Sequence, residues 1–195
     1  MLTLMLDSSN TDLSIGISKD YNIIYKTSFA CWQRQSELMI PELEKALKET
    51  KLEINDFNEI VCSIGPGSYT GIRIALTIAK TIAVMNENIK LKCVSSLRVF
   101  GGRDKKFIAL MNARSKRSYI GVYDHDKTIL EDKVLTNEEV LAYINEHKDF
   151  EVIGDVSYLG LENNLPDVVT SMNSLSEILP NCEDVLKVKP SYLKD

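Results

Sequence analysis

The order of the strand-like and helix-like segments is the feature that most limits the fold of this chain. Three β-type runs come first ("LTLMLDSS", "LSIGIS", "NIIYKTSFA"), followed by a helix expected over 36–50, the strand "EIVCSI", a helix over about 70–85 and the strand "LKCV". The same order then begins again with "KFIALMN", "SYIGVYD" and "TILEDKVL", the helix "TNEEVLAYINEH" and the strand "FEVIGD". This repetition predicts a duplicated α/β unit, with an N-terminal lobe over 1–100 and a shortened C-terminal lobe over 101–195.

The composition is that of an ordinary globular protein. Hydrophobic residues make up 44% of the 195 positions and charged residues 26%, and no apolar run reaches the roughly 18 residues of a membrane span. The first stretch, "MLTLMLDSS", has no basic residue and reaches Asp7 after six positions, so we expect a first strand and not a signal peptide. We therefore expect a cytoplasmic protein with no membrane partner.

The charge is unevenly distributed along the chain. A net charge of -5 argues against a protein that binds nucleic acid by itself, yet the segment 98–117 holds seven Lys or Arg and one Asp. Such a segment is either a contact surface for RNA or a protein partner, or a solvated loop and strand edge. Both interpretations stay open, and any contact with tRNA is expected to be weak or indirect.

Neither the cysteines nor the histidines have the spacing of a metal site. The four cysteines include no CxxC pair, and the two histidines lie far apart in the sequence, so none has a ligand partner at helical spacing. The residues concerned are Cys31, Cys62, Cys93, Cys182, His125 and His147. We expect reduced, buried thiols, surface histidines, no metal and no cofactor.

The stretch "GPGSYTG" at 65–71 is glycine-rich but matches no standard phosphate-binding motif. Ile72 and Arg73 follow its last glycine where a P-loop has Lys and then Ser or Thr, and its spacing does not give the dinucleotide fingerprint. Its glycines permit close backbone approach, and its hydroxyls can cap the next helix. It is either a structural turn and cap or, because helix N-termini attract anions, an anion or partner contact. The residues that carry either interpretation are Gly65, Gly67, Ser68 and Gly71.

The helix expected over 72–85 is apolar around most of its circumference. Only a narrow polar stripe interrupts it, formed by Arg73, Thr77, Lys80 and Thr81. A helix of this kind must be covered on more than one side. One side faces the sheet, and the other is covered either by a second chain or by the other helix of the same lobe.

Several segments together resemble one protein family. "LMLDSSNTDLSIGIS", "QRQSELMIPELEKAL", "IVCSIGPGSYTGIRIALTIAKTIA", "MNARSKRSYIGVYD" and "KPSYLK" resemble, in this order, segments of the TsaB (YeaZ) family. The resemblance implies the actin-like, Hsp70-like ATPase (ribonuclease H-like) fold, an α/β architecture of two lobes that each contain a mixed five-stranded-type sheet and helices. It also implies a cytoplasmic, non-catalytic subunit of the machinery that installs N6-threonylcarbamoyl on adenosine 37 of tRNA.

The resemblance implies partners as well. These are a TsaD-type catalytic paralogue, which the protein binds and activates, and a TsaE-type ATPase, with a homodimer when the protein is alone. We expect the helices over 36–49 and 72–85 to pair with the same helices of the paralogue. Gln35 stands where the family often has His, so the role of that position stays open. The expected partner contacts are Glu37, Ile40, Leu43, Glu44, Arg73, Leu76, Thr77, Ala79, Lys80 and Ala83.

The alternative is a nucleotide-binding enzyme of the same superfamily, either a sugar-kinase-like phosphotransferase or a degenerate glycoprotease. In the kinase architecture the first hairpin faces phosphates, so Asp7, Ser8 and Ser9 are candidate anion contacts, and Asp7 could orient a magnesium-bound water. The second unit, "MNARSKRS", has no matching acidic residue or glycine, and no Ser or Cys has an evident base. We therefore expect no catalytic residues, with Asp7 capping the hairpin.

Overall fold

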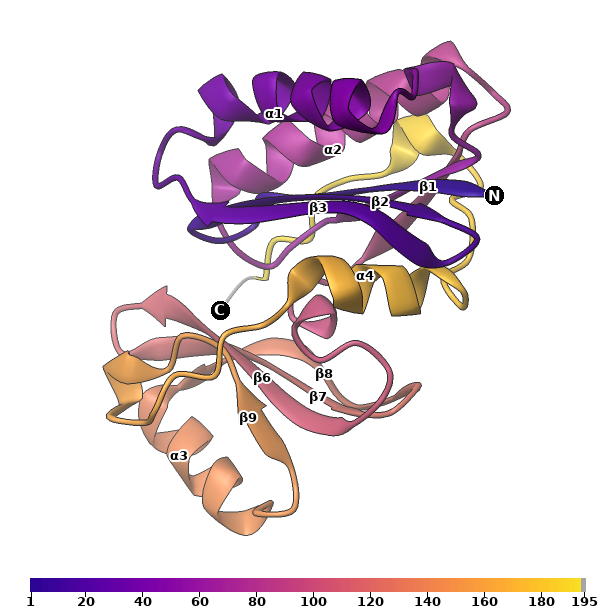
Figure 1. The fold of residues 1–195 in the computed structure, drawn as a ribbon. Coiled ribbons are helices and arrows are strands. Elements are labelled where there is room, and N and C mark those ends of the chain that lie inside the picture. Colours follow the sequence, from indigo (N-terminus) through magenta and orange to yellow (C-terminus); the bar gives the residue numbers. More distant parts are fainter. Residues whose placement is uncertain (194–195) are drawn as a thin grey trace.

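The protein has two lobes, each built on one mixed sheet, in a computed structural model that describes residues 1–193 (Figure 1). The first sheet has the strand order β3-β2-β1-β4-β5 and the second has the order β8-β7-β6-β9. The expected five-stranded type is therefore confirmed for the first lobe, whereas the second sheet has four strands within the described residues. In each sheet the first three strands form an antiparallel meander, and later strands run parallel to the first of them. The expected duplication of an α/β unit is confirmed.

The first lobe places both of its helices on the same face of its sheet (Figure 1). Apolar residues are continuous along β1 because the two faces of this strand are both covered: Leu4 and Leu6 pack under the helices, while Met5 points to the opposite side. The elements of this lobe are β1 (Leu2–Asp7), β2 (Asp12–Lys19), β3 (Asn22–Ala30), α1 (Gln35–Thr50), η1 (Ile54–Asp56), β4 (Glu59–Ser63), α2 (Tyr69–Met85) and β5 (Lys90–Val94).

The second lobe repeats the β-β-β-α-β order, and its helix packs on β7 and β8. Thr136 caps this helix with its hydroxyl, which accepts from the Glu139 N–H, and the Glu139 carboxylate accepts from the Thr136 N–H in return. The elements are η2 (Arg98–Phe100), which leads into the lobe, β6 (Lys106–Arg114), β7 (Arg117–Asp124), β8 (Lys127–Thr136), α3 (Asn137–Glu146), β9 (Glu151–Ile153) and η3 (Ser157–Leu159).

The chain then returns to the first lobe. Helix α4 (Val168–Ser176) packs on β1, β2 and β3, on the face of the first sheet opposite α1 and α2 (Figure 1). The sequence predicts that 101–195 form the second lobe, whereas the described residues from 168 to 193 pack against the first. Short amphipathic helices carry no signal for which of two sheets they cover, because either exposed face offers the same apolar contact.

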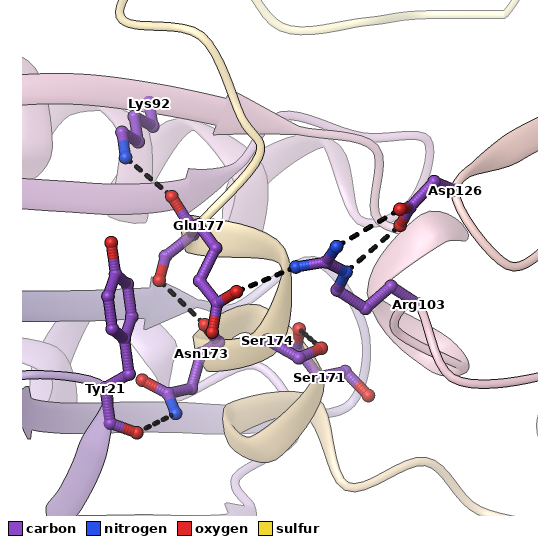
Figure 2. Close-up of polar contacts among 9 residues, drawn as sticks. Tyr21, Lys92, Arg103, Asp126, Ser171, Asn173, Ser174 and Glu177 are labelled. Atoms are coloured by element: carbon purple, nitrogen blue, oxygen red, sulfur yellow. Dashed lines mark hydrogen bonds and ion pairs between the residues drawn. The ribbon is translucent and has the colours of Figure 1, made fainter.

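Helix α4 also ties the two lobes together. Its residues Val169, Met172 and Leu175 share one buried cluster with Met5 of the first sheet and Phe107 of the second. Polar contacts surround this cluster (Figure 2): Asn173 Nδ2 donates to Tyr21 O at 2.6 Å, and Arg103 contacts both Asp126 and Glu177. The interface between the lobes is therefore a continuation of the core and not a solvated hinge.

The last described residues form a C-terminal strap, defined here as residues 181–193. It includes η4 (Val185–Lys187), which packs on α2, and Lys80 Nζ of α2 donates to Leu186 O and Val188 O at 2.9 and 2.8 Å. Tyr192 docks the strap on the start of α2, since its ring stacks on Tyr69 with the centroids 5.1 Å apart. Within residues 1–193, no helix is both long enough and apolar enough to cross a bilayer.

Candidate functional site

The glycine loop between β4 and α2 packs directly on the turn that follows β1. Gly67 has a φ of 147°, and a Cβ there would overlap the carbonyl oxygen of Ser9. A Cβ on Gly71 would overlap the carbonyl oxygen of Ser8. The two segments are also joined by hydrogen bonds, from Ser68 N to Ser9 O and from Ser8 Oγ to Gly71 O, both at 2.7 Å. The close approach that these glycines permit is to the protein's own backbone.

Further polar groups of the loop are paired within the chain. Ser68 Oγ accepts from Gly71 N at 3.2 Å and caps α2. On the other side, Gly65 O accepts from Ser96 N at 2.8 Å, and Gly65 N donates to Ser96 Oγ at 3.0 Å. This geometry favours the structural turn and cap over a phosphate cradle.

Asp7 is enclosed by the same packing. Its side chain is 3% exposed and accepts from the Ser63 hydroxyl and, at 3.4 Å, from Ser9 N. Burial raises the pKa of Asp7 above its ordinary value, against the lowering effect of these hydrogen bonds. Asp7 thus joins β1, β4 and the turn that follows β1. This geometry favours the expected role of Asp7 as a cap of the hairpin.

A cleft of about 750 Å³ opens between the lobes beside this loop. Asn10, Thr11 and the first turns of α1 and α2 form one wall, and the end of β6 with η3 forms the other. Asp155 and Arg114 are the charged residues that line it, with Trp32, Tyr69, Tyr119 and Tyr158 as its aromatic groups. A phosphotransferase cleft needs carboxylates around the metal-bound phosphates, and Asp7 does not line this one. Among residues 1–193, no cluster of three or more His, Cys, Asp or Glu side chains could hold a metal ion.

Gln35, the first residue of α1, lines the cleft and is bonded to the turn that follows β1. Its side chain is 7% exposed, and Nε2 donates to Asn10 O at 3.2 Å. The amide thus fixes the start of α1 to the hairpin turn. Helix α1 begins at Gln35, one residue before the expected range 36–50, and Arg34 occupies the cap position without a side-chain hydrogen bond.

The outer surface of α1 and α2 contains part of the expected partner contacts. We call this surface the α1–α2 outer face, and its exposed members are Glu37, Ile40, Glu44, Arg73 and Thr77. Ile40 is 46% exposed, which is unusual for an isoleucine among charged neighbours.

Five other expected partner contacts have roles inside the chain. The side chains of four apolar residues are at most 5% exposed and lie in the core between the helices and the sheet: Leu43, Leu76, Ala79 and Ala83. They were expected on a partner surface, but they lie in the buried cluster of the first lobe, where α1 packs on α2. Lys80 anchors the C-terminal strap. The sequence pattern could not separate cover by a neighbouring helix from cover by a second chain.

The basic segment 98–117 does not form a continuous positive surface. Arg98 is 8% exposed, lies 4.7 Å from the Tyr123 ring centroid and donates to the His125 carbonyl oxygen. Arg103 pairs with Asp126 and Glu177, Lys105 with Glu151, and Lys106 with Asp124. Three of the seven cations are therefore paired with carboxylates and Arg98 is buried, which favours the loop-and-edge interpretation, while Arg114 and Lys116 are exposed near the cleft.

The cysteines are all free, but they are not equally enclosed. Cys31 and Cys62 are buried, while Cys93 and Cys182 are half-buried. The expectation of buried thiols therefore holds for two of the four. Sequence spacing gave no signal that the Cys93 and Cys182 sulfur atoms lie 3.4 Å apart, because 89 positions separate them.

Comparison with known proteins places this geometry in a family. The family model described as "TsaD: tRNA N6-adenosine threonylcarbamoyltransferase" matches residues 31–185. The chain is 31% identical to the tRNA threonylcarbamoyladenosine biosynthesis protein TsaB of Bacillus subtilis over 73% of its own length and 63% of that protein. It is 26% identical to the protein of the same name from Buchnera aphidicola of Acyrthosiphon pisum, over 95% of its own length and 86% of that protein.

A solved structure gives the same architecture. YeaZ from Pseudomonas aeruginosa superposes with a TM-score of 0.77 at 17% identity, covering 98% of this chain and 99% of that one. Together with the strand orders, this defines a two-lobed α/β protein of the actin-like, ribonuclease H-like class, as expected. The chain belongs to the TsaD family, and the two relatives from Bacillus and Buchnera carry the TsaB name. The chain matches less than two thirds of the length of the Bacillus relative.

Proposed function

We propose that this chain is a non-catalytic subunit of the machinery that makes tRNA N6-threonylcarbamoyladenosine, and that it binds and activates a TsaD-type transferase. The observation that carries the proposal is the family match, because the relatives that align with the chain are named for this biosynthesis. Two features of the site support the non-catalytic part. The cleft is lined by a single carboxylate, and Asp7 is already bonded to Ser63 and Ser9.

The α1–α2 outer face is the surface we propose for the transferase. It presents Ile40 within a ring of charged and polar side chains, the pattern of an apolar anchor with a polar rim. An interface of about 1,600 Å² is the usual size for a specific complex. Binding at this face activates the transferase if the face binds the catalytically competent arrangement of the transferase lobes more tightly than the other arrangements. Without the transferase, the same face pairs two copies of this chain into a homodimer.

The direct test is to mix the purified chain with a TsaD-type transferase. We expect a complex of defined mass, and threonylcarbamoyl transfer to tRNA that is faster with the chain than without it. The chain alone should turn over no ATP and transfer no threonylcarbamoyl group. Transfer at an unchanged rate, or transfer by the chain alone, would contradict the proposed function.

A matched pair of variants locates the surface. Ile40→Asp should weaken the complex at least about 10-fold, because a charge in the centre of an interface is left without a partner. Ile129→Asp is the control, since Ile129 is 49% exposed, close to the 46% of Ile40, but lies on β8 of the second lobe. If the transferase binds the two variants with equal affinity, the α1–α2 outer face is not its binding surface.

Two further partners belong to the proposal. A TsaE-type ATPase joins the complex once the transferase is bound, and tRNA contacts this chain weakly through the exposed end of the β6–β7 hairpin at Arg114 and Lys116. Filter binding across a salt series tests the RNA contact. Loss of most of the weak binding in Arg114→Ala would support it, whereas binding absent at low salt would end it.

A further inference from the structure

The C-terminal strap begins beside the edge strand of the first sheet. Cys182 N donates to Leu91 O at 2.7 Å, and Asn181 forms an antiparallel bridge with Lys92. This pairing brings the Cys182 side chain next to Cys93 of β5, with the two sulfur atoms 3.4 Å apart. A disulfide needs its sulfurs at about 2 Å, so the two sulfur atoms must approach each other by roughly a further 1.4 Å for the bond to form.

The chain is anchored on both sides of Cys182. Before it, Lys92 Nζ donates to Ser176 O at 2.6 Å and pairs with Glu59, which holds the end of α4 against the sheet. Figure 2 shows Lys92 beside the end of this helix. After Cys182, Lys80 Nζ holds Leu186 O and Val188 O. The two sulfurs are thus kept together by the native fold.

We propose that Cys93 and Cys182 form a reversible intramolecular disulfide when the protein meets a peroxide. The Cys182 thiolate attacks one oxygen of the peroxide, the O–O bond breaks, and the leaving hydroxide takes up a proton to give water. The product is a sulfenic acid on Cys182. The Cys93 sulfur, losing its proton, then attacks the Cys182 sulfur, the S–O bond breaks, and the hydroxyl group leaves as a second water. Two thiols are oxidised and one peroxide is reduced.

The surroundings assign the order of the two steps and exclude the neighbouring thiol. Burial raises the pKa of the Cys93 thiol, and the adjacent Cys182 adds to this effect, so Cys93 is the poorer first nucleophile. Cys62 is the register neighbour of Cys93 on β4, but it is fully buried, and burial raises the pKa of its thiol well above the usual value. Cys182 and Cys93 are both half-buried and so remain within reach of a small oxidant.

The bond would fasten the strap to β5 at its first residues. The strap covers α2 through η4 and reaches the rim of the cleft, where Tyr192 stacks on Tyr69. Because the bond joins positions 89 apart, it would also restrict the unfolded chain and raise the melting temperature. For a chain of this size we expect a rise of at least about 4 °C.

The test uses the full-length reduced protein and hydrogen peroxide, followed by alkylation and mass spectrometry. We expect a loss of two hydrogens, a peptide pair that joins Cys93 to Cys182, a higher melting temperature, and full reversal by dithiothreitol. Cys93→Ser and Cys182→Ser should each abolish the cross-link. Cys62→Ser and Cys31→Ser are the controls and should keep it.

Three results would overturn the proposal. They are a cross-link that involves Cys62, a cross-link between two chains, and oxidation of Cys182 to a sulfinic acid with no disulfide. A second readout covers the case in which a serine variant is unstable. Hydrogen exchange of residues 182–193 in the wild-type protein should slow at least about 10-fold on oxidation and recover on reduction. Exchange that does not change while the disulfide forms would show that the bond does not restrain the strap.

Discussion

At the residue scale, the glycine loop shows that the same residue type can bring the backbone close to a ligand or close to another segment of the chain. The sequence alone does not separate these two roles. Glycine allows backbone to approach either a phosphate or another backbone, and the motif looks alike in both cases. Here the partners are the carbonyl oxygens of Ser8 and Ser9, which come from a turn more than fifty positions away. The pattern therefore predicted a close approach correctly, but not what is approached.

Gly71→Ala should destabilise the protein, although alanine is normally the better residue in a helix. The added Cβ would overlap Ser8 O, and overpacking of this kind costs about 1–3 kcal/mol. Urea denaturation measures the difference. Gly160→Ala is the control, because nothing lies within 4 Å of its position and only the strain of its φ of 74° remains. A Gly71→Ala protein more stable than the wild type would show that the hairpin turn can move away from the loop.

Asp7→Asn should make the protein more stable at neutral pH. Burial raises the folded-state pKa of Asp7, so ionisation of this carboxyl penalises the folded state once the pH exceeds the unfolded-state value. The penalty is absent at lower pH, grows as the pH rises between the two pKa values and is complete above the folded-state pKa. Asparagine keeps an acceptor for Ser63 without this penalty. Unfolding free energies measured from pH 3 to pH 7 should therefore diverge in favour of Asp7→Asn, and parallel curves would contradict the assignment.

At the element scale, the helices and strands themselves were largely predictable, whereas their partners were not. The apolar periodicity of α2 and the capping residues of α3 are local, and both helices lie where the sequence indicates. The cover of Leu76 and Ala79 by α1, and the placement of α4 on the first sheet, depend on contacts between distant segments. Periodicity says that a face is buried and does not say what buries it.

Lys92 gives an element-scale prediction because it joins three strands and a helix. The Lys92 ammonium lies 2.6 Å from the Glu59 carboxylate and also donates to the carbonyl oxygen of Ser176, the last residue of α4. The Glu59 carboxylate in turn accepts from the Thr3 hydroxyl at 2.8 Å. Lys92→Met should cost about 3–5 kcal/mol, since it leaves the buried Glu59 carboxylate unpaired. The double variant Lys92→Met with Glu59→Gln should recover at least half of that loss in urea denaturation. Equal losses in the single and double variants would mean that the charge pair itself is unimportant.

At the scale of the whole molecule, the two lobes are joined by apolar packing more than by charge. The buried cluster around Met172 runs from the first sheet through α4 to the second sheet. Arg103 also bridges the lobes, but its side chain is 25% exposed and its acidic partners are about half exposed. Exposed ion pairs contribute little because water screens them.

Met172→Ala and Arg103→Ala should therefore differ clearly. We expect the first to cost about 2–5 kcal/mol through the cavity that it leaves, and the second less than about 1 kcal/mol. Denaturant titrations at low and high salt separate the two contributions. A larger loss for Arg103→Ala, especially one that disappears at high salt, would show that charge holds the lobes together.

The return of α4 to the first sheet also fixes when that lobe is finished during translation. Its five strands and two helices leave the ribosome early, but the side that carries Met5 and Val61 lacks the part of its cover that α4 provides until residues 168–176 have been made. A nascent chain that stalls within the second lobe therefore exposes part of the apolar face of the first sheet to solvent. Among all the intermediates of its synthesis, that species has the greatest need of a chaperone.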